Sequence, residues 1–327
     1  MKSLRRYFSR WQNMLGFFLV LVFIAVAIAA PVLSPQDADH PGPIKYIGLK
    51  TDYRPHSPAE APPLGTLSTQ ISVYHALVWG TRSAVVFGIL VAGITALIGS
   101  LIGAVSGYFG GFVNRLSMRI TDAFLSFPII AGVVLISQLV MNAFAAAGVE
   151  IQNAPFGLIY YRYSGGGVEF FELHQLPKLL TFLLGIDRVL IALILFSWMP
   201  YARVMNVVVS RVRNTDYIEA SRALGAGHGR LIFRHLIPNS VTPIIVMAAK
   251  DVGGMVLLQA TFTFIGLGGN SPWGLMLVRG RDWIISPNGI LTFWWVFLPA
   301  TLALILFGIG WNLLGDGLND ALNPRTT

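Results

Sequence analysis

The stretch SAVVFGILVAGITALIGSLIGAVS, Ser83–Ser106, decides the class of fold. It contains no charged side chain. An α-helix rises 1.5 Å per residue, so about 20 apolar residues cross the roughly 30 Å hydrocarbon core of a membrane. We therefore expect this stretch to form a transmembrane helix.

Five more stretches extend this pattern to both ends of the chain. Four have similar length and apolar character: Met14–Leu33, Ala123–Ala147, Val241–Ile265 and Ile290–Leu314. The fifth, Val189–Ser210, carries Pro200 and Arg203, so we expect its inner end to lie in a wet or protein-lined setting. The chain is 54% hydrophobic and 12% charged, whereas soluble domains are about 25% charged. The sequence predicts an all-α membrane protein with six transmembrane helices and both termini in the cytoplasm.

The distribution of charge supports this orientation. With the N-terminus inside, the inner segments hold thirteen Lys and Arg against five acids, and the outer segments hold nine of each sign. The whole net charge of +8 then lies on the inner face, as the positive-inside rule predicts. The basic balance therefore needs no nucleic-acid partner.

The first span resembles a secretory signal peptide in its basic start and its small residues, Ala25, Ala27 and Ala29. Its apolar run exceeds the usual core of about 7–15 residues, which favours an uncleaved anchor. We expect residues 1–78 to form this anchor helix and a proline-rich external strap. Residues 79–327 then form a five-helix core with a cytoplasmic loop at 211–240. A second external segment, Gly148–Arg188, holds an apolar run at 176–186 that is too short to span and that we expect to lie at the interface or on the bundle.

Residue patterns that carry enzyme chemistry are absent from the sequence. None of the five lysines follows a glycine, so the chain has no P-loop for ATP. It has no cysteine, no HExxH pair of histidines and no Gly-x-Ser-x-Gly elbow. We expect no catalytic, cofactor or metal site.

Two features inside the spans leave alternatives open. Gly99, Gly103, Gly107 and Gly111 are four residues apart, which gives one smooth helix face for packing within the chain, or for a sliding or dimer contact. Lys250 and Asp251 lie near the middle of the fifth span, where an unpaired charge is costly. They form buried pairs with neighbouring helices or line a polar translocation path.

The loop Arg211–Asn239 is rich in arginine and punctuated like two short helices. Asp216 and Glu219 have the spacing of a capping box, and Gly225 is placed to end the first helix. A second helix is expected from His228 to Leu236, ending before Pro238. Such a loop could simply lie on anionic lipid headgroups.

The order of residues in this loop indicates a more specific role. Glu219-Ala220-Ser221-x-x-x-Gly225, followed after nine residues by His235-Leu236-Ile237-Pro238, resembles the EAA loop of bacterial ABC-importer permeases. Its wider sequence is similar to the second, C-type permease of the dipeptide, oligopeptide and nickel group. Further motifs of that group follow in order: Pro63-Leu64-Gly65-Thr66, Gly107-Tyr108-Phe109-Gly110-Gly111, Ser126-Phe127-Pro128, Phe264-Ile265-Gly266-Leu267-Gly268 and Asn312-Leu313-Leu314-Gly315-Asp316-Gly317-Leu318.

The resemblance implies a permease of the bacterial or archaeal plasma membrane that forms half of a pathway for peptides or similar small solutes. It implies partners: ATPase subunits that bind the ATP, a second permease and an extracytoplasmic solute-binding protein, besides membrane lipid. It assigns Glu219, Ala220, Ser221, Arg222, Gly225 and Pro238 to ATPase coupling. Lys250, Asp251 and Gln259, the last standing where the group commonly has Glu, are candidates for the pathway.

Two rival classes remain to be tested. A secondary transporter driven by an ion gradient would explain Lys250 and Asp251, but the broken inverted repeats typical of that class are not evident. An intramembrane hydrolase would need a base beside Ser126, Ser137 or Ser197, and the predicted spans hold no histidine.

Overall fold

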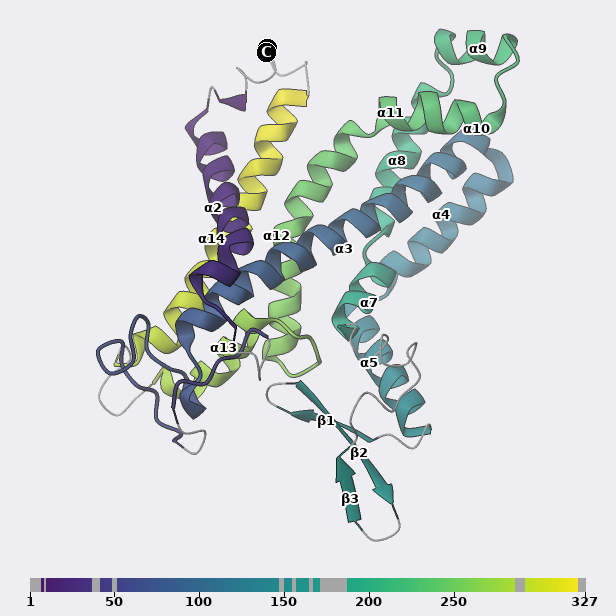
Figure 1. Ribbon diagram of the computed structural model, residues 1–327. Helices are drawn as coiled ribbons and strands as arrows, with labels where there is room; N and C mark the ends of the chain where they lie inside the picture. Colours follow the sequence, from purple (N-terminus) through teal and green to yellow (C-terminus); the bar gives the residue numbers. More distant parts are fainter. Residues whose placement is uncertain are drawn as a thin grey trace.

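A computed structural model describes residues 7–8, 10–36, 42–48, 52–146, 150–154, 157–164, 167–170, 187–285 and 292–322 of the chain. Nearly all of this is helical (Figure 1). The main helices are α2 (Trp11–Leu33), α3 (Val73–Phe109), α4 (Gly111–Ser126), α5 (Ile129–Ala146), α7 (Arg188–Phe196), α8 (Met199–Val212), α12 (Thr242–Phe264), α13 (Pro272–Gly280) and α14 (Trp294–Leu322).

The predicted spans are present as helices. Five are long and apolar enough to cross a membrane: α2, α3, the combined α7 and α8 at Arg188–Val212, α12 and α14. A sixth is obtained if α4 and α5 count as one bent span. The predicted fold class, an all-helical membrane bundle with up to six spans, is confirmed.

The predicted span Ala123–Ala147 is interrupted by a bend. The chain bends by 88° between α4 and α5. Phe127 is extended at φ −82° and ψ 124°, since the ring of Pro128 disfavours the helical conformation of the residue before it. The proline also lacks the N–H that a continuous helix needs.

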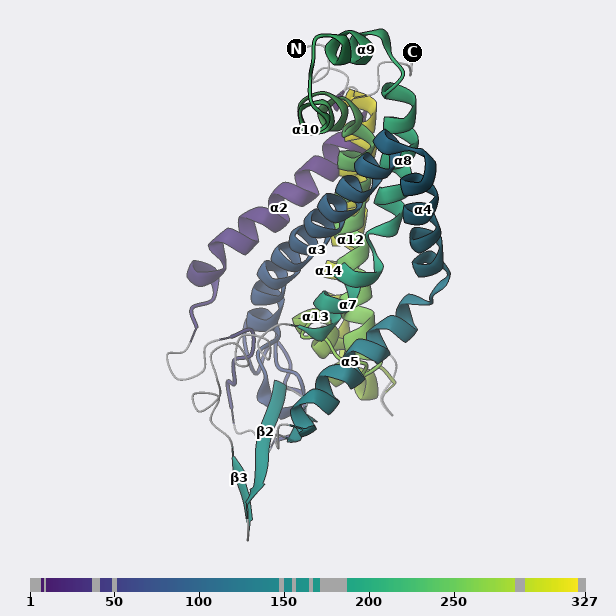
Figure 2. The ribbon, with the colours of Figure 1, turned by 90° about the vertical axis from the view of Figure 1, so that its right-hand side faces the viewer.

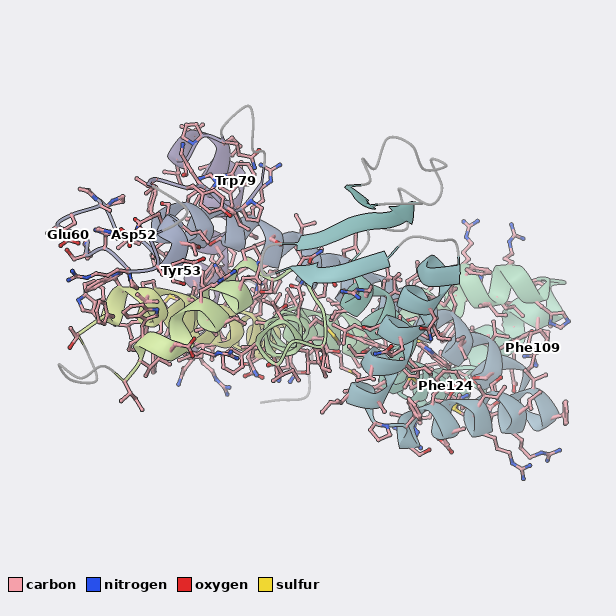
Figure 3. All side chains as sticks on the ribbon, turned by 90° about the horizontal axis from the view of Figure 1, so that it is seen from below. Asp52, Tyr53, Glu60, Trp79, Phe109 and Phe124 are labelled. Carbon is pink, nitrogen blue, oxygen red and sulfur yellow. The ribbon has the colours of Figure 1, made fainter. Side chains whose placement is uncertain are left out.

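Helix α3 is longer than predicted and crosses the whole molecule. It begins at Val73, where the Ser72 hydroxyl accepts a hydrogen bond from the His75 amide at 3.2 Å. Trp79 lies beside the external strap, whereas Phe109 lies at the opposite edge of the molecule (Figure 3). Helix α3 therefore connects the end of the bundle that holds the strap with the end that holds the loop after α8.

The core is built around α3. Helix α8 packs along its second half, and α12, α14 and α2 pack along its first half. One apolar cluster lies where α3 meets α12, α13 and α14, and a second lies where α3 and α8 reach the loop that follows α8.

The start of α2 and the end of α14 lie at the same end of the bundle (Figure 2). Arg10 Nη1 lies 3.1 Å from Asp320 Oδ2, and Asn13 donates to the same oxygen at 3.3 Å. The start of α2 is thus beside the end of α14, and the cytoplasmic position of both termini stays a prediction.

The opposite end carries the strap and a small sheet. The strap includes a short 3₁₀ turn, η1 (Ser68–Gln70), and bridges from Tyr46 to Ile71 and from Thr66 to Ser72. The sheet has three antiparallel strands, β1 (Glu150–Ala154), β2 (Gly157–Ser164) and β3 (Gly167–Phe170), which the sequence analysis did not predict. The apolar run at 176–186 lies outside the described residues.

Candidate coupling surface

The loop that follows α8 folds into a knob at the end of the bundle that holds both termini (Figures 1 and 2). The knob comprises α9 (Asp216–Ala223), α10 (His228–Arg230), the π-helical turn η3 (Leu231–Leu236) and α11 (Ile237–Ser240). Helix α9 projects beyond the other helices (Figure 1).

The start of α9 differs from the prediction. Its N-cap residue is Thr215, and no side chain caps the helix. The Thr215 hydroxyl instead donates to the Val212 carbonyl at 2.6 Å, which closes the end of α8. Asp216 and Glu219 both lie in the first turn, where negative charge is favoured by the helix dipole. The predicted capping box was therefore wrong.

The end of α9 is the predicted glycine stop. Gly225 has φ +83°, a conformation that costs an L-residue about 1–2 kcal/mol. The Gly225 amide donates to the Arg222 carbonyl at 3.0 Å and the Ala226 amide to the Ser221 carbonyl at 3.1 Å. These two bonds make a Schellman motif, which satisfies the last carbonyls of the helix.

The second helix of the knob does not end before Pro238 as predicted. The π-turn lengthens the bonding interval, so that the Ile237 amide reaches the Ile232 carbonyl. Pro238 then lies in the first turn of α11, where its missing N–H is not needed. The chain continues almost directly into α12.

The underside of the knob is apolar and closely packed. Ile218, Leu231 and Leu236 are fully buried in a cluster with Met205 and Val209 of α8. Burial of such side chains stabilises a contact by roughly 1.5–3 kcal/mol each. The knob is therefore anchored to the bundle by its apolar face.

Polar contacts fix the same joint to the end of α3. The Tyr108 hydroxyl lies 2.7 Å from His228 Nδ1. Arg213 Nη1 donates to the Gly107 carbonyl at 2.9 Å, and the Arg222 guanidinium lies 6.0 Å from the centre of the Tyr108 ring. These contacts join α9, α10 and α3 into one unit.

The predicted coupling residues lie on the outer surface of the knob, with one exception. Glu219, Ala220, Arg222, Gly225 and Pro238 are exposed. Ser221 is half-buried, and its hydroxyl donates to the Tyr217 carbonyl at 2.7 Å.

Three exposed apolar residues on the knob were missed by the sequence analysis. Leu224 is 89% exposed, Phe233 is 61% exposed and Tyr217 is 44% exposed. Large apolar side chains in a loop of otherwise charged and small residues are the signal that was available. With the charged residues they make a mixed apolar and polar surface, as protein interfaces have.

The three candidate pathway residues contact three different neighbours. Lys250 Nζ lies 2.6 Å from Asp316 Oδ1 on α14. The Tyr201 hydroxyl of α8 donates to Asp251 Oδ2 at 2.6 Å. The structure therefore gives each charge a partner on a neighbouring helix and does not bring the three residues together.

Gln259 is buried and belongs to a hydrogen-bonded cluster that the sequence analysis missed. Its Nε2 donates to Asp187 Oδ2 at 2.7 Å, and the Asn270 amide donates to the same oxygen at 3.1 Å. Asp187 Oδ1 also accepts from the Val189 amide at 2.9 Å and so caps α7. The sequence signal that could have indicated this cluster was Asp187 itself, because an aspartate directly before an apolar helix is a typical N-cap residue.

The glycine stripe of α3 packs within the chain. A Cβ at Gly107 would lie 2.9 Å from the Asn206 carbonyl oxygen, and Cβ atoms at Gly99 and Gly103 would overlap the backbone of α8. Of the two alternatives, packing within the chain holds for these three residues. Gly111 is separate because it begins α4 at φ +50°.

Comparison with known proteins places this geometry in a family. A profile described as "Binding-protein-dependent transport system inner membrane component" matches residues 99–327. The chain is 29% identical over 325 residues to "Glutathione transport system permease protein GsiD" of Pectobacterium atrosepticum, covering 98% of this chain and 89% of the relative. It is 29% identical over 310 residues to "Probable D,D-dipeptide transport system permease protein DdpC" of Escherichia coli, covering 94% and 85%.

The likeness extends to a relative from Bacillus subtilis. "Oligopeptide transport system permease protein OppC" of Bacillus subtilis is 26% identical over 328 residues, covering 99% of this chain and 88% of the relative. The similarity therefore includes the first span and the strap as well as the matched core.

Proposed function

Because the chain belongs to the family of inner membrane components of binding-protein-dependent transport systems, we propose that it moves peptides or similar small solutes as one of two permease subunits. We propose further that a separate ATPase subunit binds the knob at α9. Family membership makes the chain a multi-pass permease component rather than the ATPase. It also decides against the ion-gradient alternative, since these systems depend on a binding protein.

The observation that carries the coupling proposal is the build of the knob. Its underside is buried through Ile218, Leu231 and Leu236, while Glu219 and Arg222 face outward. A rigid element transmits a displacement imposed by a partner to the helices that it contacts, whereas a flexible loop would deform instead. The knob is continuous with α12 and joined to α3, so nucleotide-driven closure of the ATPase would shift both helices.

The pathway proposal rests on α12. One face of this helix holds Lys250, Gly254 and Thr261, spaced by helical turns. Gly254 and Thr261 are exposed, and the Lys250 side chain is 38% exposed. A charged and a hydroxyl side chain are poorly suited to lipid, so we assign this face to the path between the two permeases. Asp251 lies at the edge of the same face.

The cargo proposal rests on the relatives. The permeases that this chain resembles are described by glutathione, D,D-dipeptide and oligopeptide transport. A binding protein delivers the solute, a second permease completes the path, and ATP is bound by the partner subunits.

The coupling proposal is tested by Glu219→Lys. The reversed charge removes an anion from the first turn of α9 and from the proposed interface, so the ATPase should no longer copurify with the permease and uptake should be abolished. Asp282→Lys is the matched control, because Asp282 is an exposed acid near the opposite end of the bundle. Membrane insertion of both variants is checked by immunoblot of membrane fractions. Normal copurification and uptake with Glu219→Lys would defeat the coupling assignment.

A further inference from the structure

One face of α12 is left open by the rest of the chain. Gly254 is exposed, and a Cβ built there would meet no atom within 4 Å. Leu257 is 41% exposed and Thr261 is exposed on the next turns. This open face is the one assigned above to the translocation path.

Asp251 lies at the edge of the open face, far from either end of its helix. It is nine residues beyond Thr242, which corresponds to roughly 14 Å along the helix axis. Its side chain is half-buried. Gly254 is three residues further on, so the two positions are neighbours on the helix surface.

The carboxylate is held in place from one side. The Tyr201 hydroxyl donates to Oδ2 at 2.6 Å, and the Tyr201 side chain is fully buried on α8. In the part of the chain that the structure describes, Tyr201 is the recorded partner of Asp251, and it is neutral. The second oxygen, Oδ1, has no recorded hydrogen bond within that part.

The adjacent cation does not neutralise Asp251. Lys250 is paired with Asp316 on α14 at 2.6 Å. Successive residues of a helix point about 100° apart, so one lysine does not serve both carboxylates. Among the described residues, Asp251 therefore has no counter-ion, at a mid-membrane depth where charged side chains without one are costly and face water-filled paths.

We propose that Asp251 is a cation-recognition point of the translocation path, which binds an ammonium or guanidinium group of the passing solute. Tyr201 is its positioning residue, since its hydroxyl fixes one oxygen and leaves the other for the cation. The inference rests on the proposed function, because it requires the open face of α12 to line the path.

A thiol placed beside Asp251 tests both parts separately. The chain has no cysteine, so Gly254→Cys gives this subunit one thiol, at a position with room for the side chain. In the complete importer, its reaction with a trimethylammonium-ethyl and with a sulfonatoethyl methanethiosulfonate is followed by the mass of this chain. Both rates are normalised to those of a free thiol.

We expect both reagents to react and the cationic one to be favoured by roughly tenfold, as for a charge in a confined path. Adding Asp251→Asn, which keeps an acceptor for Tyr201 but removes the charge, should bring the ratio close to one. Adding Asp251→Glu should preserve it. A thiol that neither reagent reaches would overturn the assignment of this face to the path. If the thiol reacts and the ratio of the two normalised rates is the same in Asp251→Asn, the cation site alone is overturned. A permanent counter-ion for Asp251, seen in a structure of the complete importer, would overturn it as well.

Transport provides the second measurement. The complete importer in proteoliposomes is given the tripeptides Ala-Lys-Ala and Ala-Glu-Ala, and the ratio of their uptake rates is compared between variants. The same binding protein serves every variant, so its own preference cancels. We expect Asp251→Asn to lower the lysine-to-glutamate ratio severalfold and Thr261→Val, on the same face, to leave it unchanged. Equal ratios in Asp251→Asn and wild type would contradict the inference, whereas uptake of neither peptide by wild type would defeat the peptide assignment and leave the thiol experiment to decide on Asp251.

Discussion

The knob and the strap lie at opposite ends of the bundle and are held in different ways. The knob consists of short helices. Helix α9 ends in a Schellman motif at Gly225, and fully buried apolar side chains such as Ile218 anchor the knob to the bundle. The strap has irregular backbone, and side chains satisfy part of its polar groups: Gln70 Nε2 donates to the Arg54 carbonyl at 3.0 Å, and the His56 amide donates to Thr66 Oγ1 at 2.9 Å.

Because the two ends are held by different interactions, their conformations should depend differently on solution conditions. Apolar burial does not depend on small changes in pH, so the packing of the knob on the bundle should not depend on them either. The strap depends on hydrogen bonds and exposed charges, and Asp52 and Glu60 lie close together on it (Figure 3). Its conformation should therefore respond to solution conditions more than that of the knob.

The largest effect is expected from Ile218→Asp. Removing a buried side chain of this size costs about 2–5 kcal/mol, and the added carboxylate would lie in the apolar cluster below the knob. Helix α9 should separate from the bundle, so that trypsin cleaves rapidly at Arg222 and Arg230 in permease held in nanodiscs. Leu224→Asp, at an 89% exposed position of the same loop, should leave cleavage as slow as in wild type. Equal cleavage of the two variants would show that apolar burial does not anchor the knob.

A smaller effect is expected from Gly225→Ala. The φ of +83° costs an alanine about 1–2 kcal/mol, which corresponds to amide exchange about 5–30-fold faster at the end of α9. Gly227→Ala is the matched control, because Gly227 has φ −69° and neither position has an atom within 4 Å of the added Cβ. Hydrogen exchange measured by mass spectrometry over residues 216–226 distinguishes them. Equal exchange in both variants would remove the Schellman motif from the account of rigidity.

The smallest effect is a pH dependence of the strap. The hydrogen bond that His56 Nε2 donates to Asp52 Oδ2, at 2.9 Å, raises the pKa of His56, and the charges of Asp52 and Glu60 act in the same direction. The same hydrogen bond lowers the pKa of Asp52. Stability from a raised histidine pKa is complete below its unfolded value of about 6.5 and is lost as the pH rises through the folded pKa. Stability from the lowered Asp52 pKa is present above about 3.9 and is lost as the pH falls through the folded pKa.

The strap should therefore be most ordered in mildly acidic solution and loosen as the pH rises past neutrality. NMR titration of the His56 ring gives its pKa directly, and exchange of the strap amides gives the loosening. Asp52→Asn should move the His56 pKa back toward its ordinary value. A His56 pKa that is the same in both proteins would rule out this pair as the cause.

Much of the fold was predictable because helices in lipid are dictated by local sequence. Backbone groups must bond within the segment, so a run such as Ser83–Ser106 has one available structure. The end of α9 was predictable for a similar reason, since Gly225 alone signals the stop, and residue order alone carries the family resemblance. The bend at Phe127–Pro128 was also signalled locally, although a single span was predicted across it.

Contacts between distant segments were not predictable in this way. Asp187 and Gln259 are 72 residues apart in the sequence, and nothing in either neighbourhood indicates the other. The partners of Lys250 and Asp251 likewise depend on where α14 and α8 pass α12.

The sequence by itself determined that the protein lies in a membrane, which family it belongs to and where helix α9 of its knob ends. These outcomes follow from hydropathy, residue order and backbone preference, which are local properties. Only the tertiary structure decided that the glycine stripe packs on α8, that Lys250 is paired with Asp316, and that the described partner of Asp251 is the Tyr201 hydroxyl. Those outcomes depend on which helices come together in space, and a charge is paired or unpaired according to its neighbours there.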